Sequence, residues 1–493
     1  MKRTTILSAI AALVIVTLAG CYVGYDDGAG SVGIPLPDPR TVSQGAAAEY
    51  ARIFVLNGPI LLELGEDTPF EEFDLTPSEG QTLSEATVGP VPAGDGYRIV
   101  LVFGDYQTGA GGDYFVPSEY ALSDPFTVHG GQATAVDAEL GPTPFVGVGG
   151  SDILGLDLKG IVFTGTNLYV ADPDTLYQAV ATPADFETGV SFGSSFAAPG
   201  GRTINSITLG AMEGGVAGPT GDVQTVWLNT TQGLLPFVGS TFDSSFDDGS
   251  ELETTSILDS GAFILPADYS LYGYVQFDGG LSAVRDFDGG SGPDWMKPTD
   301  LSDLVSGQPI YDLAVQLTGS NVYGYFATKL GAFRMPDTVI SDDTIDTAQE
   351  VFESSDFFEV SINGTKAVIT QIAIDPSGSG EIYLGTPRGA VRVPAAEAAK
   401  IGSEDNVPLD ATLIPGTEGL IVEDIVMGGD YVVVLTNHFL VYSTNGGDSF
   451  ASAPLPVYAS SAGTVNEIFL DTSGGVVLLA GSSGLAGVDI DGP

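Results

Sequence analysis

Apolar residues recur along this chain in short runs that suit β-strands. Between residues 47 and 142 the clearest runs are YARIFVL at 50–56, ILLEL at 60–64 and YRIVLVF at 97–103, and PFTV and ATAVDAEL follow near the end. Turn-forming residues separate them, as in Val91-Pro92-Ala93-Gly94 before Tyr97 and in His129-Gly130-Gly131. Short apolar runs bounded by glycine and proline are typical of strands, so an all-β domain is predicted over 47–142.

The remaining residues, 143–493, contain an internal repeat. Its unit is an apolar strand ending in a small residue and a Thr-like position, then a turn, then a second apolar strand. The clearest copy is IYLGTPRGAVRVP at 382–394, and YFATKLGAFRMP at 325–336 aligns with it without a gap. The aligned turn positions are Asp172, Thr230, Phe277, Thr328, Thr386, Thr436 and Ser482, which lie 46 to 58 residues apart.

This repeat predicts a β-propeller. Seven copies at such a period indicate four-stranded blades around a central axis, and six blades are the alternative because the copy at Phe277 is weak. A further apolar segment precedes most copies, at 160–165, 370–375, 422–427 and 465–470. We assign these segments to the innermost strands. The chain then ends after the third strand of the last blade, and residues 144–148 are expected to supply the fourth strand and so protect its edge.

The first residues have the pattern of an export signal. Lys2 and Arg3 precede an apolar run from Ile6 to Leu18, which is too short to cross a bilayer core of ~30 Å as a helix. Leu18-Ala19-Gly20-Cys21 resembles the lipobox of bacterial lipoproteins. That resemblance implies removal of residues 1–20 as a signal peptide and diacylation (palmitate or similar chains) of Cys21. The expected location is the bacterial cell envelope, at the outer membrane or the cell surface.

The lone cysteine agrees with this interpretation. Cys21 is the only cysteine in the chain, so no disulfide can form within it. Residues 22–46 are rich in Gly, Pro and Asp and lack an apolar period, which predicts a lipid-anchored flexible tether over 21–46. Residues 47–142 resemble small transthyretin-like or immunoglobulin-like β-sandwich modules. The expected fold class is therefore all-β, with a small N-terminal β-sandwich followed by a β-propeller over 143–493.

The net charge of the chain limits the classes of molecule that it is expected to bind. The chain has 64 acidic and 15 basic residues, for a net charge of −49. Such a field repels nucleic acid and anionic lipid headgroups, so we exclude nucleic acid and expect membrane contact only through the lipid anchor. The acidic residues are spread along the chain, which favours solubility in a salty habitat over a clustered cation site.

One acidic segment resembles a calcium loop. It contains Asp286, Asp288 and Asp294, but Ser291 and Lys297 stand where an EF-hand needs Gly and Glu. A looser Ca²⁺ site on the three aspartates is one interpretation, and a solvated acidic loop is the other. No other cofactor is expected. His129 and His438 fall in different predicted domains, so they cannot form a His/Cys metal cluster with an acylated cysteine.

A second motif carries information on fold. The segment 443–450 matches the pattern S-x-[DN]-x-G-x-[ST]-[FW] at Ser443, Asn445, Gly447, Ser449 and Phe450. It resembles the Asp-box (BNR repeat) of sialidase-type and sortilin-type propellers. In those families the Asp-box is a structural hairpin far from the active face. The resemblance therefore implies a propeller and carries no catalytic assignment.

A third motif bears on enzyme activity. Phe333-Arg334-Met335-Pro336 resembles the (F/Y)-R-I-P motif of sialidases, whose arginine holds the substrate carboxylate. Val391-Arg392-Val393-Pro394 occupies the same frame one repeat later, which indicates a feature of the repeat. We find no set of three arginines, a Tyr–Glu pair and an acid that would complete a sialidase site.

Three functional hypotheses follow. The first is a binding or assembly module without catalysis, which contacts a protein or glycan ligand at the cell surface. Its ligand face would use the long segments between repeats, at 181–223, 239–271 and 285–305, including Trp295. The second is a sialidase-like glycan hydrolase that uses Arg334 in an axial pocket. The third is an inert structural envelope protein.

Overall fold

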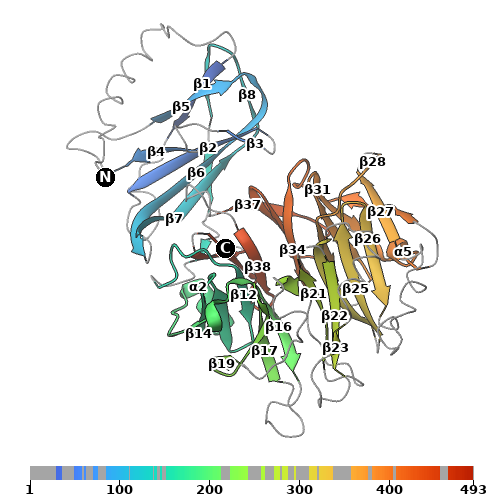
Figure 1. Ribbon diagram of the computed structural model, residues 1–493. Coiled ribbons are helices and arrows are strands. Elements are labelled where there is room, and N and C mark those ends of the chain that lie inside the picture. Colours follow the sequence, from blue (N-terminus) through green and yellow to red (C-terminus); the bar gives the residue numbers. More distant parts are fainter. Residues whose placement is uncertain are drawn as a thin grey trace. The chain divides into compact units, whose positions relative to one another are not determined.

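The computed structural model shows an almost entirely β-stranded chain (Figure 1). It describes residues 29–35, 49–57, 60–62, 70–75, 85–109, 112–136, 138–141, 145–146, 152–212, 223–242, 257–260, 271–277, 280–286, 294–295, 310–318, 321–336, 357–362, 364–375, 380–402, 407–455, 465–482 and 484–491. The chain divides into two compact units, the N-terminal unit (Met1–Asp105 and Val116–Thr143) and the C-terminal unit (Tyr106–Phe115 and Pro144–Pro493). Among the described residues, no helix is long and apolar enough to cross a bilayer.

The N-terminal unit is built around two sheets. The first has the order β5-β1-β9, with β1 (Ala29–Pro35), β5 (Glu85–Pro92) and β9 (Ala133–Ala135). The second has the order β10-β7-β6-β2-β3, with β4 beside β2 and β8 beside β6. Its strands are β2 (Tyr50–Asn57), β3 (Ile60–Leu61), β4 (Phe70–Asp74), β6 (Gly94–Gly109), β7 (Gly112–Ser123), β8 (Phe126–Val128) and β10 (Ala138–Gly141).

One hydrophobic core joins the two sheets. Ala51, Ile53 and Val55, on one face of β2, are fully buried in it, and Phe54 and Leu56 on the opposite face are buried as well, so β2 is covered on both faces. Val32 and Ile34 of β1 belong to the same cluster. The predicted strands at 50–56 and 97–103 are therefore core strands of this unit.

The tether predicted over 21–46 is wrong for residues 29–35. These residues form β1, which pairs antiparallel with β5 and parallel with β9. Only Val32 and Ile34 are large apolar residues in AGSVGIP, so no apolar period marks the strand in the sequence. Partner strands on both edges pair its backbone, and its Val32 and Ile34 side chains are buried against residues of the second sheet. Cys21 and the signal segment 1–20 lie outside the described residues, so lipidation stays a prediction.

Glu71 on β4 gives this unit a pH dependence. Burial raises the pKa of Glu71 from 4.5 to about 7, against the lowering effect of a hydrogen bond from the Gly89 backbone. The folded state thus holds this proton more tightly than the unfolded state, and stability falls as pH rises from about 4.5 to 7. Glu71→Gln should raise the free energy of unfolding at pH 8 by about 1–2 kcal/mol, after allowance for partial solvent screening, and leave it unchanged near pH 4.

Thermal denaturation at both pH values measures this effect. Asp74→Asn is the matched control, because Asp74 lies on the same strand with an exposed side chain. An equal gain for both variants, or a Glu71→Gln gain that persists at pH 4, would contradict the assignment to Glu71.

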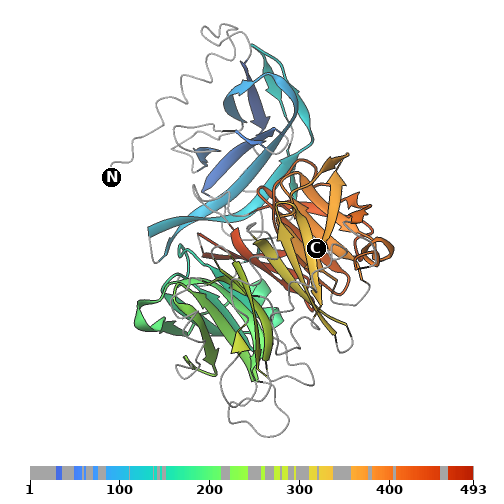
Figure 2. The same ribbon diagram turned by 45° about the vertical axis from the view of Figure 1, so that its right-hand side comes forward.

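The described strands of the C-terminal unit form seven sheets, numbered here in chain order (Figures 1 and 2). Sheet 1 comprises β12 (Gly160–Phe163), β13 (Asn167–Ala171), β14 (Thr175–Val180) and β15 (Ser194–Ala197). Sheet 2 comprises β16 (Ile204–Met212), β17 (Val223–Thr230), β18 (Gly233–Val238) and β19 (Thr241–Phe242). Sheet 3 comprises β20 (Ile257–Ser260), β21 (Leu271–Phe277), β22 (Gly280–Asp286) and β23 (Asp294–Trp295). Sheet 4 comprises β24 (Ile310–Thr318), β25 (Asn321–Thr328), β26 (Gly331–Pro336), β27 (Phe357–Ile362), β28 (Thr365–Lys366) and β32 (Val407–Leu409).

Sheets 5 to 7 complete the unit. Sheet 5 comprises β29 (Gln371–Ile374), β30 (Ile382–Thr386), β31 (Gly389–Val393) and β33 (Thr412–Leu413). Sheet 6 comprises β34 (Val422–Gly428), β35 (Tyr431–Thr436), β36 (Phe439–Ser443) and β37 (Ala451–Pro454). Sheet 7 comprises β38 (Val465–Asp471), β39 (Val476–Gly481), β40 (Gly484–Asp489) and β11 (Phe145–Val146). Short helices α2 (Pro183–Thr188), η1 (Pro199–Gly201) and α5 (Ala395–Ala398) lie in the connections.

The seven sheets form a ring, and the unit is a β-propeller. The first strands of sheets 7, 1, 2 and 3 contact in that order, as do those of sheets 4, 5, 6 and 7. Sheets 3 and 4 are joined by the Gln276 side chain, whose Nε2 donates to the Ile310 carbonyl at 2.7 Å. These first strands include the segments predicted to be innermost, because β12, β29, β34 and β38 fall within them.

The ring closes as the sequence predicts. The last sheet takes its fourth strand from β11, in which Phe145 pairs with Val488 and Val146 with Gly487. The start and the end of the propeller sequence thus share one sheet, and the edge of β40 is covered.

The Thr-like position of the repeat has a structural cause. The hydroxyl groups of four such threonines donate to the carbonyl three residues on, at 2.6–2.8 Å: Thr230 to Gly233, Thr328 to Gly331, Thr386 to Gly389 and Thr436 to Phe439. Asp172 supports the equivalent turn in sheet 1 by accepting from the Thr175 backbone N–H at 2.7 Å. Each of these turns joins the second and third strands of its sheet.

Candidate binding face of the propeller

The two ends of the propeller differ in composition. Because neighbouring strands are antiparallel, each first strand begins beside the end of its second strand, as Ile310 does beside Thr328 and Val422 beside Thr436. The starts of the first strands and the threonine turns therefore lie at one end, which we name the hairpin end. The segment 444–450, which follows the third strand β36, lies at the other end, named the Asp-box end.

Each first strand opens with a four-residue frame. Its first and fourth residues are mostly apolar, its second is partly or fully exposed, and its third is mostly polar. The copies are Leu158-Lys159-Gly160-Ile161, Ile204-Asn205-Ser206-Ile207, Ile257-Leu258-Asp259-Ser260, Ile310-Tyr311-Asp312-Leu313, Ile369-Thr370-Gln371-Ile372, Val422-Glu423-Asp424-Ile425 and Val465-Asn466-Glu467-Ile468. In five of them, in sheets 2, 3, 4, 6 and 7, the register shifts between the first and third residues. Such a β-bulge leaves the second residue unpaired and directs it out of the sheet.

The third residue of the frame ties neighbouring sheets together. The Asp312 carboxylate accepts from the Ile372 backbone N–H at 2.7 Å, which joins sheet 4 to sheet 5. The Glu467 carboxylate accepts from the Ile161 backbone N–H at 3.2 Å and so joins sheet 7 to sheet 1. Ser206 donates to the Leu258 carbonyl at 3.0 Å between sheets 2 and 3. These bonds fix the backbone from which the second residues project.

Large apolar side chains are exposed at this end. Leu258 and Tyr311, both at the second position of the frame, are 42% and 40% exposed. Leu330 at the tip of a threonine turn is 43% exposed, and Ile421, directly before β34, is 48% exposed. Among the described residues the other exposed large apolar side chains are Tyr106 and Val180. Scattered single residues of this kind are ordinary, but most of those described here lie at one end of one unit.

Carboxylates outnumber cations at the hairpin end. Among the described residues the side chains concerned are those of Asp157, Asp172, Asp174, Asp312, Glu418, Glu423, Asp424 and Glu467, against Lys159, Arg202, Lys329 and Arg388. Lys159 is already paired with Asp157 at 2.6 Å. Desolvation by the surrounding protein raises the pKa of Glu423. The hairpin end therefore combines apolar side chains with negative charge.

The residues of the predicted Asp-box, at 443–450, make a closed set of local bonds. Ser443 Oγ accepts from the Gly447 N–H at 2.9 Å and donates to Asn445 Oδ1 at 2.8 Å. Asn445 Oδ1 also accepts from the Ser449 N–H at 3.0 Å, and Asn445 Nδ2 donates to the Ser449 hydroxyl at 2.8 Å. Phe450 is half-buried. The motif therefore acts locally, as a hairpin that folds back on itself after β36.

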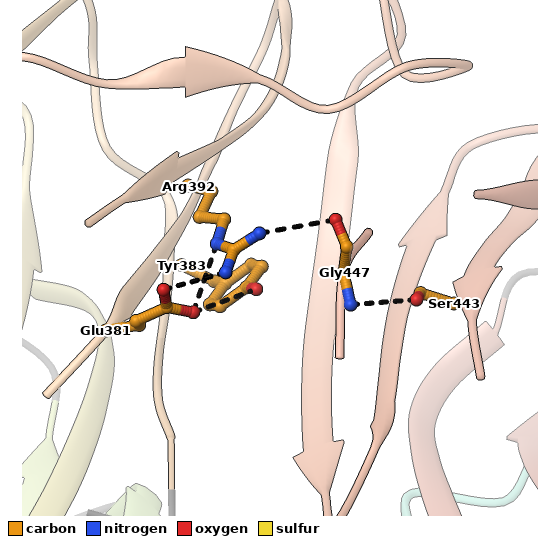
Figure 3. A network of polar contacts seen from close by, with 5 residues as sticks. All are labelled: Glu381, Tyr383, Arg392, Ser443 and Gly447. Carbon is orange, nitrogen blue, oxygen red and sulfur yellow. Dashed lines mark hydrogen bonds and ion pairs between the residues drawn. The ribbon is translucent and has the colours of Figure 1, made fainter. Parts of the chain in front are cut away.

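A polar network connects this hairpin to the preceding sheet (Figure 3). Arg392 on β31 donates to the Glu381 carboxylate at 2.7 and 3.0 Å and to the Gly447 carbonyl at 3.3 Å. Tyr383 lies beside both charged groups, and its hydroxyl donates to Glu381 at 3.5 Å. Burial, together with the nearby carboxylates and against the effect of Arg392, raises the pKa of Tyr383 to about 12. The network holds sheets 5 and 6 together at the Asp-box end.

Arg392→Met should loosen this end. The substitution keeps much of the side-chain length but removes the guanidinium, so the Gly447 carbonyl loses its partner in sheet 5. We expect a loss of about 1–2 kcal/mol in the free energy of unfolding and faster amide hydrogen exchange across 444–450. Arg392→Lys is the control for charge, and it should recover only part of the loss because lysine lacks the forked donors. Unchanged exchange in the Met variant would show that the Arg392–Gly447 bond is not stabilising.

The two residues predicted for a ligand face lie on strands. Arg334 is on β26, the third strand of sheet 4, where it pairs with Tyr325 and its guanidinium lies 5.2 Å from the Tyr323 ring centroid. One strand, β25, lies between β26 and the innermost strand β24, so Arg334 is not on the strand that lines the axis and the prediction of an axial Arg334 is wrong. Trp295 is on β23, the outermost strand of sheet 3, paired with Val284, and not in a long loop as expected. Its side chain lies outside the described set.

The proposed calcium aspartates are only partly described. Asp286 ends β22, and Asp294 begins the neighbouring strand β23, where it pairs with Arg285 beside Asp286. Asp288 lies outside the described residues, so the calcium site stays a prediction. In the part of the chain that the structure describes, no three His, Cys, Asp or Glu side chains gather as metal ligands would. His438 is a buried residue of a threonine turn, 3.0 Å from the Asn437 side chain.

Sequence reasoning missed Leu258 and Tyr311. The signal that identifies them is the four-residue frame, which is too short and too degenerate to stand out before the first strands are aligned. Once it is aligned, its second position carries Lys159, Asn205, Thr370, Glu423 and Asn466 in the other five copies. The two apolar residues in adjacent sheets are the exceptions.

Comparison with known proteins finds only distant structural similarity. No protein-family model matches the sequence, and no curated protein does. Among solved structures, PorZ, a surface component of the type-IX secretion system of Porphyromonas gingivalis, is similar with a TM-score of 0.46 and 13% identity, over 81% of this chain and 57% of PorZ. The extracellular domain of a hybrid two-component system from B. thetaiotaomicron has a TM-score of 0.43 and 9% identity, over 70% of this chain and 40% of that one.

A third similar structure has a comparable length. The β-propeller domain of Cps50 from Myceliophteria thermophila has a TM-score of 0.44 and 11% identity, over 68% of this chain and 96% of that domain. By contrast, this chain spans about half or less of the length of the two bacterial structures. At these identities and TM-scores the similarity assigns no activity to this chain.

Proposed function

We propose that this protein is an exported lipoprotein of a bacterial cell envelope whose propeller binds another protein through its hairpin end. The observation that carries the proposal is the exposure of Leu258, Tyr311, Leu330 and Ile421 at that end. Exposed apolar side chains rimmed by polar ones are characteristic of protein interaction sites. The Leu-Ala-Gly-Cys sequence at 18–21 supports export and anchoring.

The binding hypothesis fits the site better than the glycan hydrolase does. That hydrolase needed Arg334 at the axis, whereas Arg334 lies on the third strand beside Tyr323. The hairpin end instead combines aliphatic and aromatic side chains on a backbone fixed by bonds between sheets. Such a surface suits contact with a folded or extended protein segment.

Cys21→Ser tests the anchor. Acylation needs a thiol, so cells that express the wild-type protein should incorporate labelled palmitate into it and the variant should incorporate none. The variant should also be lost from the membrane fraction, because the acyl chains on Cys21 are its only proposed membrane anchor. Equal labelling of both proteins would disprove the lipoprotein assignment.

Crosslinking in native membranes tests the binding function. The tagged wild-type protein is crosslinked in membranes of its own cells and purified in parallel with Cys21→Ser. One partner recovered in stoichiometric amount, and reduced with the unanchored control, would support an envelope binding module. Recovery of no specific partner would count against the proposal and in favour of an inert envelope protein.

A further inference from the structure

The partner of the hairpin end can be described by its chemistry. We propose that this end docks a cationic protein segment, one that places aliphatic or aromatic side chains against Leu258, Tyr311 and Leu330 and lysine or arginine beside the surrounding carboxylates. This inference rests on the proposed function, since it names the class of partner for the same face.

The exposed apolar residues Leu258, Tyr311 and Leu330 lie on two neighbouring sheets. Sheets 3 and 4 are neighbours, because Gln276 of sheet 3 donates to the Ile310 carbonyl at the start of β24. Leu258 and Tyr311 therefore occupy equivalent positions on consecutive first strands. Leu330 lies at the turn of the same sheet as Tyr311. Tyrosine is enriched among the residues that carry the binding energy of protein interfaces, so Tyr311 is the expected centre of this contact.

These side chains favour a protein over a glycan. A sugar surface is covered with hydroxyl groups, so its recognition needs polar side chains that point at it, with an aromatic ring as a platform. Leucine and isoleucine offer no hydrogen bond and would leave sugar hydroxyls unpaired. Two leucines beside one tyrosine therefore suit apolar side chains of a polypeptide.

The charge of this end selects a cationic segment. Glu418 and Glu423 are exposed at sheets 5 and 6, and Asp312 lies directly after Tyr311. The whole chain carries a net charge of −49, so an acidic partner would be repelled at a distance and a basic one attracted. Complementary charge of this kind sets the association rate and excludes wrong partners.

The site is formed before any partner binds. The bond from the Ile372 N–H to the Asp312 carboxylate holds the backbone next to Tyr311, and the bulge at 310–312 directs Tyr311 outward. The bond from Ser206 to the Leu258 carbonyl does the same in sheet 3. A fixed backbone lowers the ordering cost of binding, which is an advantage for a short peptide ligand.

A peptide selection tests the class of ligand. Random peptides displayed on phage are selected on the full-length mature protein in detergent, and the survivors are sequenced. Enrichment of peptides that combine Lys or Arg with Leu, Phe, Tyr or Trp is the expected result. Enrichment of acidic peptides, or binding of a glycan array in a Tyr311-dependent manner, would overturn the inference.

Substitutions at the face test its location. Tyr311→Ser combined with Leu330→Ser should weaken the binding of the enriched peptides by about tenfold or more. Glu423→Gln should weaken them about two- to threefold and reduce the salt dependence of binding. The matched controls are Val180→Ser, an exposed apolar residue at the end of the third strand β14, and Asp430→Asn at the Asp-box end. Loss of binding in the controls, or none in the face variants, would overturn the proposal.

A photocrosslinker separates this inference from the proposed function. A photo-crosslinking phenylalanine analogue is placed at position 311 in one protein and at position 180 in another, and both are irradiated in native membranes. Crosslinks from position 311 to a basic, apolar segment of the partner support the inference. A partner recovered by the general crosslinking experiment but never from position 311 overturns the inference and leaves the proposed function standing. Thermal melting of each substituted variant confirms that it folds.

Discussion

Val32→Asp should unfold the N-terminal unit and leave the propeller folded. Val32 is fully buried in the core shared by both sheets, on a strand paired along both edges. A carboxylate placed there has no partner and loses its hydration. We expect a loss of about 4 kcal/mol or more, which is enough to unfold a unit of this size. Calorimetry should show one transition lost and the other retained.

The matched control is Pro35→Asp on the same strand. Pro35 is exposed, so a carboxylate at that position stays in water and should cost less than about 1 kcal/mol. If residues 29–35 were a tether, as their composition suggests, Val32→Asp would be as harmless as the control. If Val32→Asp melted like the wild-type protein, this result would show that β1 is not part of the core.

Gly389→Ala should destabilise the propeller strongly. Gly389 closes the turn of Thr386 with a φ of +122°, a conformation that L-residues rarely adopt. A Cβ at this position would lie 2.7 Å from the Thr417 carbonyl oxygen and 3.0 Å from Leu413 Cδ1. The added methyl group must displace backbone, so we expect a loss of about 3 kcal/mol or more in the free energy of unfolding.

Gly429→Ala separates the two causes of this loss. Gly429 also has a positive φ, +59°, but a Cβ there would meet nothing within 4 Å. Its cost should be only that of a left-handed alanine, about 1 kcal/mol. Denaturant unfolding of both variants gives the difference. Equal losses would show that the close approach to Thr417 relaxes without cost.

The propeller was predictable because its repeat occurs in several copies along the sequence. A single copy such as IYLGTPRGAVRVP says little, but its alignment with YFATKLGAFRMP placed the turns at Thr328 and Thr386 that the structure contains. Counting strands from that frame also predicted the pairing of β11 with β40. A mistake in aligning one copy of the repeat matters little when the same turn chemistry must recur in every sheet.

Features that occur once were harder to predict. Strand β1 has two apolar residues in seven and is stabilised by partners about 50 and 100 residues away in the sequence. Local pattern cannot show pairing of that kind. The choice of residues for the ligand face met a related limit. Trp295 was chosen for its place in a long segment between repeats and Arg334 for its resemblance to a sialidase motif, whereas exposure at a propeller end depends on the bulge register, which only aligned strands reveal.

The inclusion of β1 in the core also sets how far the protein can stand from a membrane. Residues 22–28 are all that separates Cys21 from Ala29, and an extended chain of that length spans about 25 Å, where residues 22–46 would span about 85 Å. With Cys21 acylated as proposed, the N-terminal unit can stand no farther than this from the bilayer. Tension between a bound partner and the membrane would then act at the start of β1, and its hydrogen bonds to β5 and β9 would resist that load.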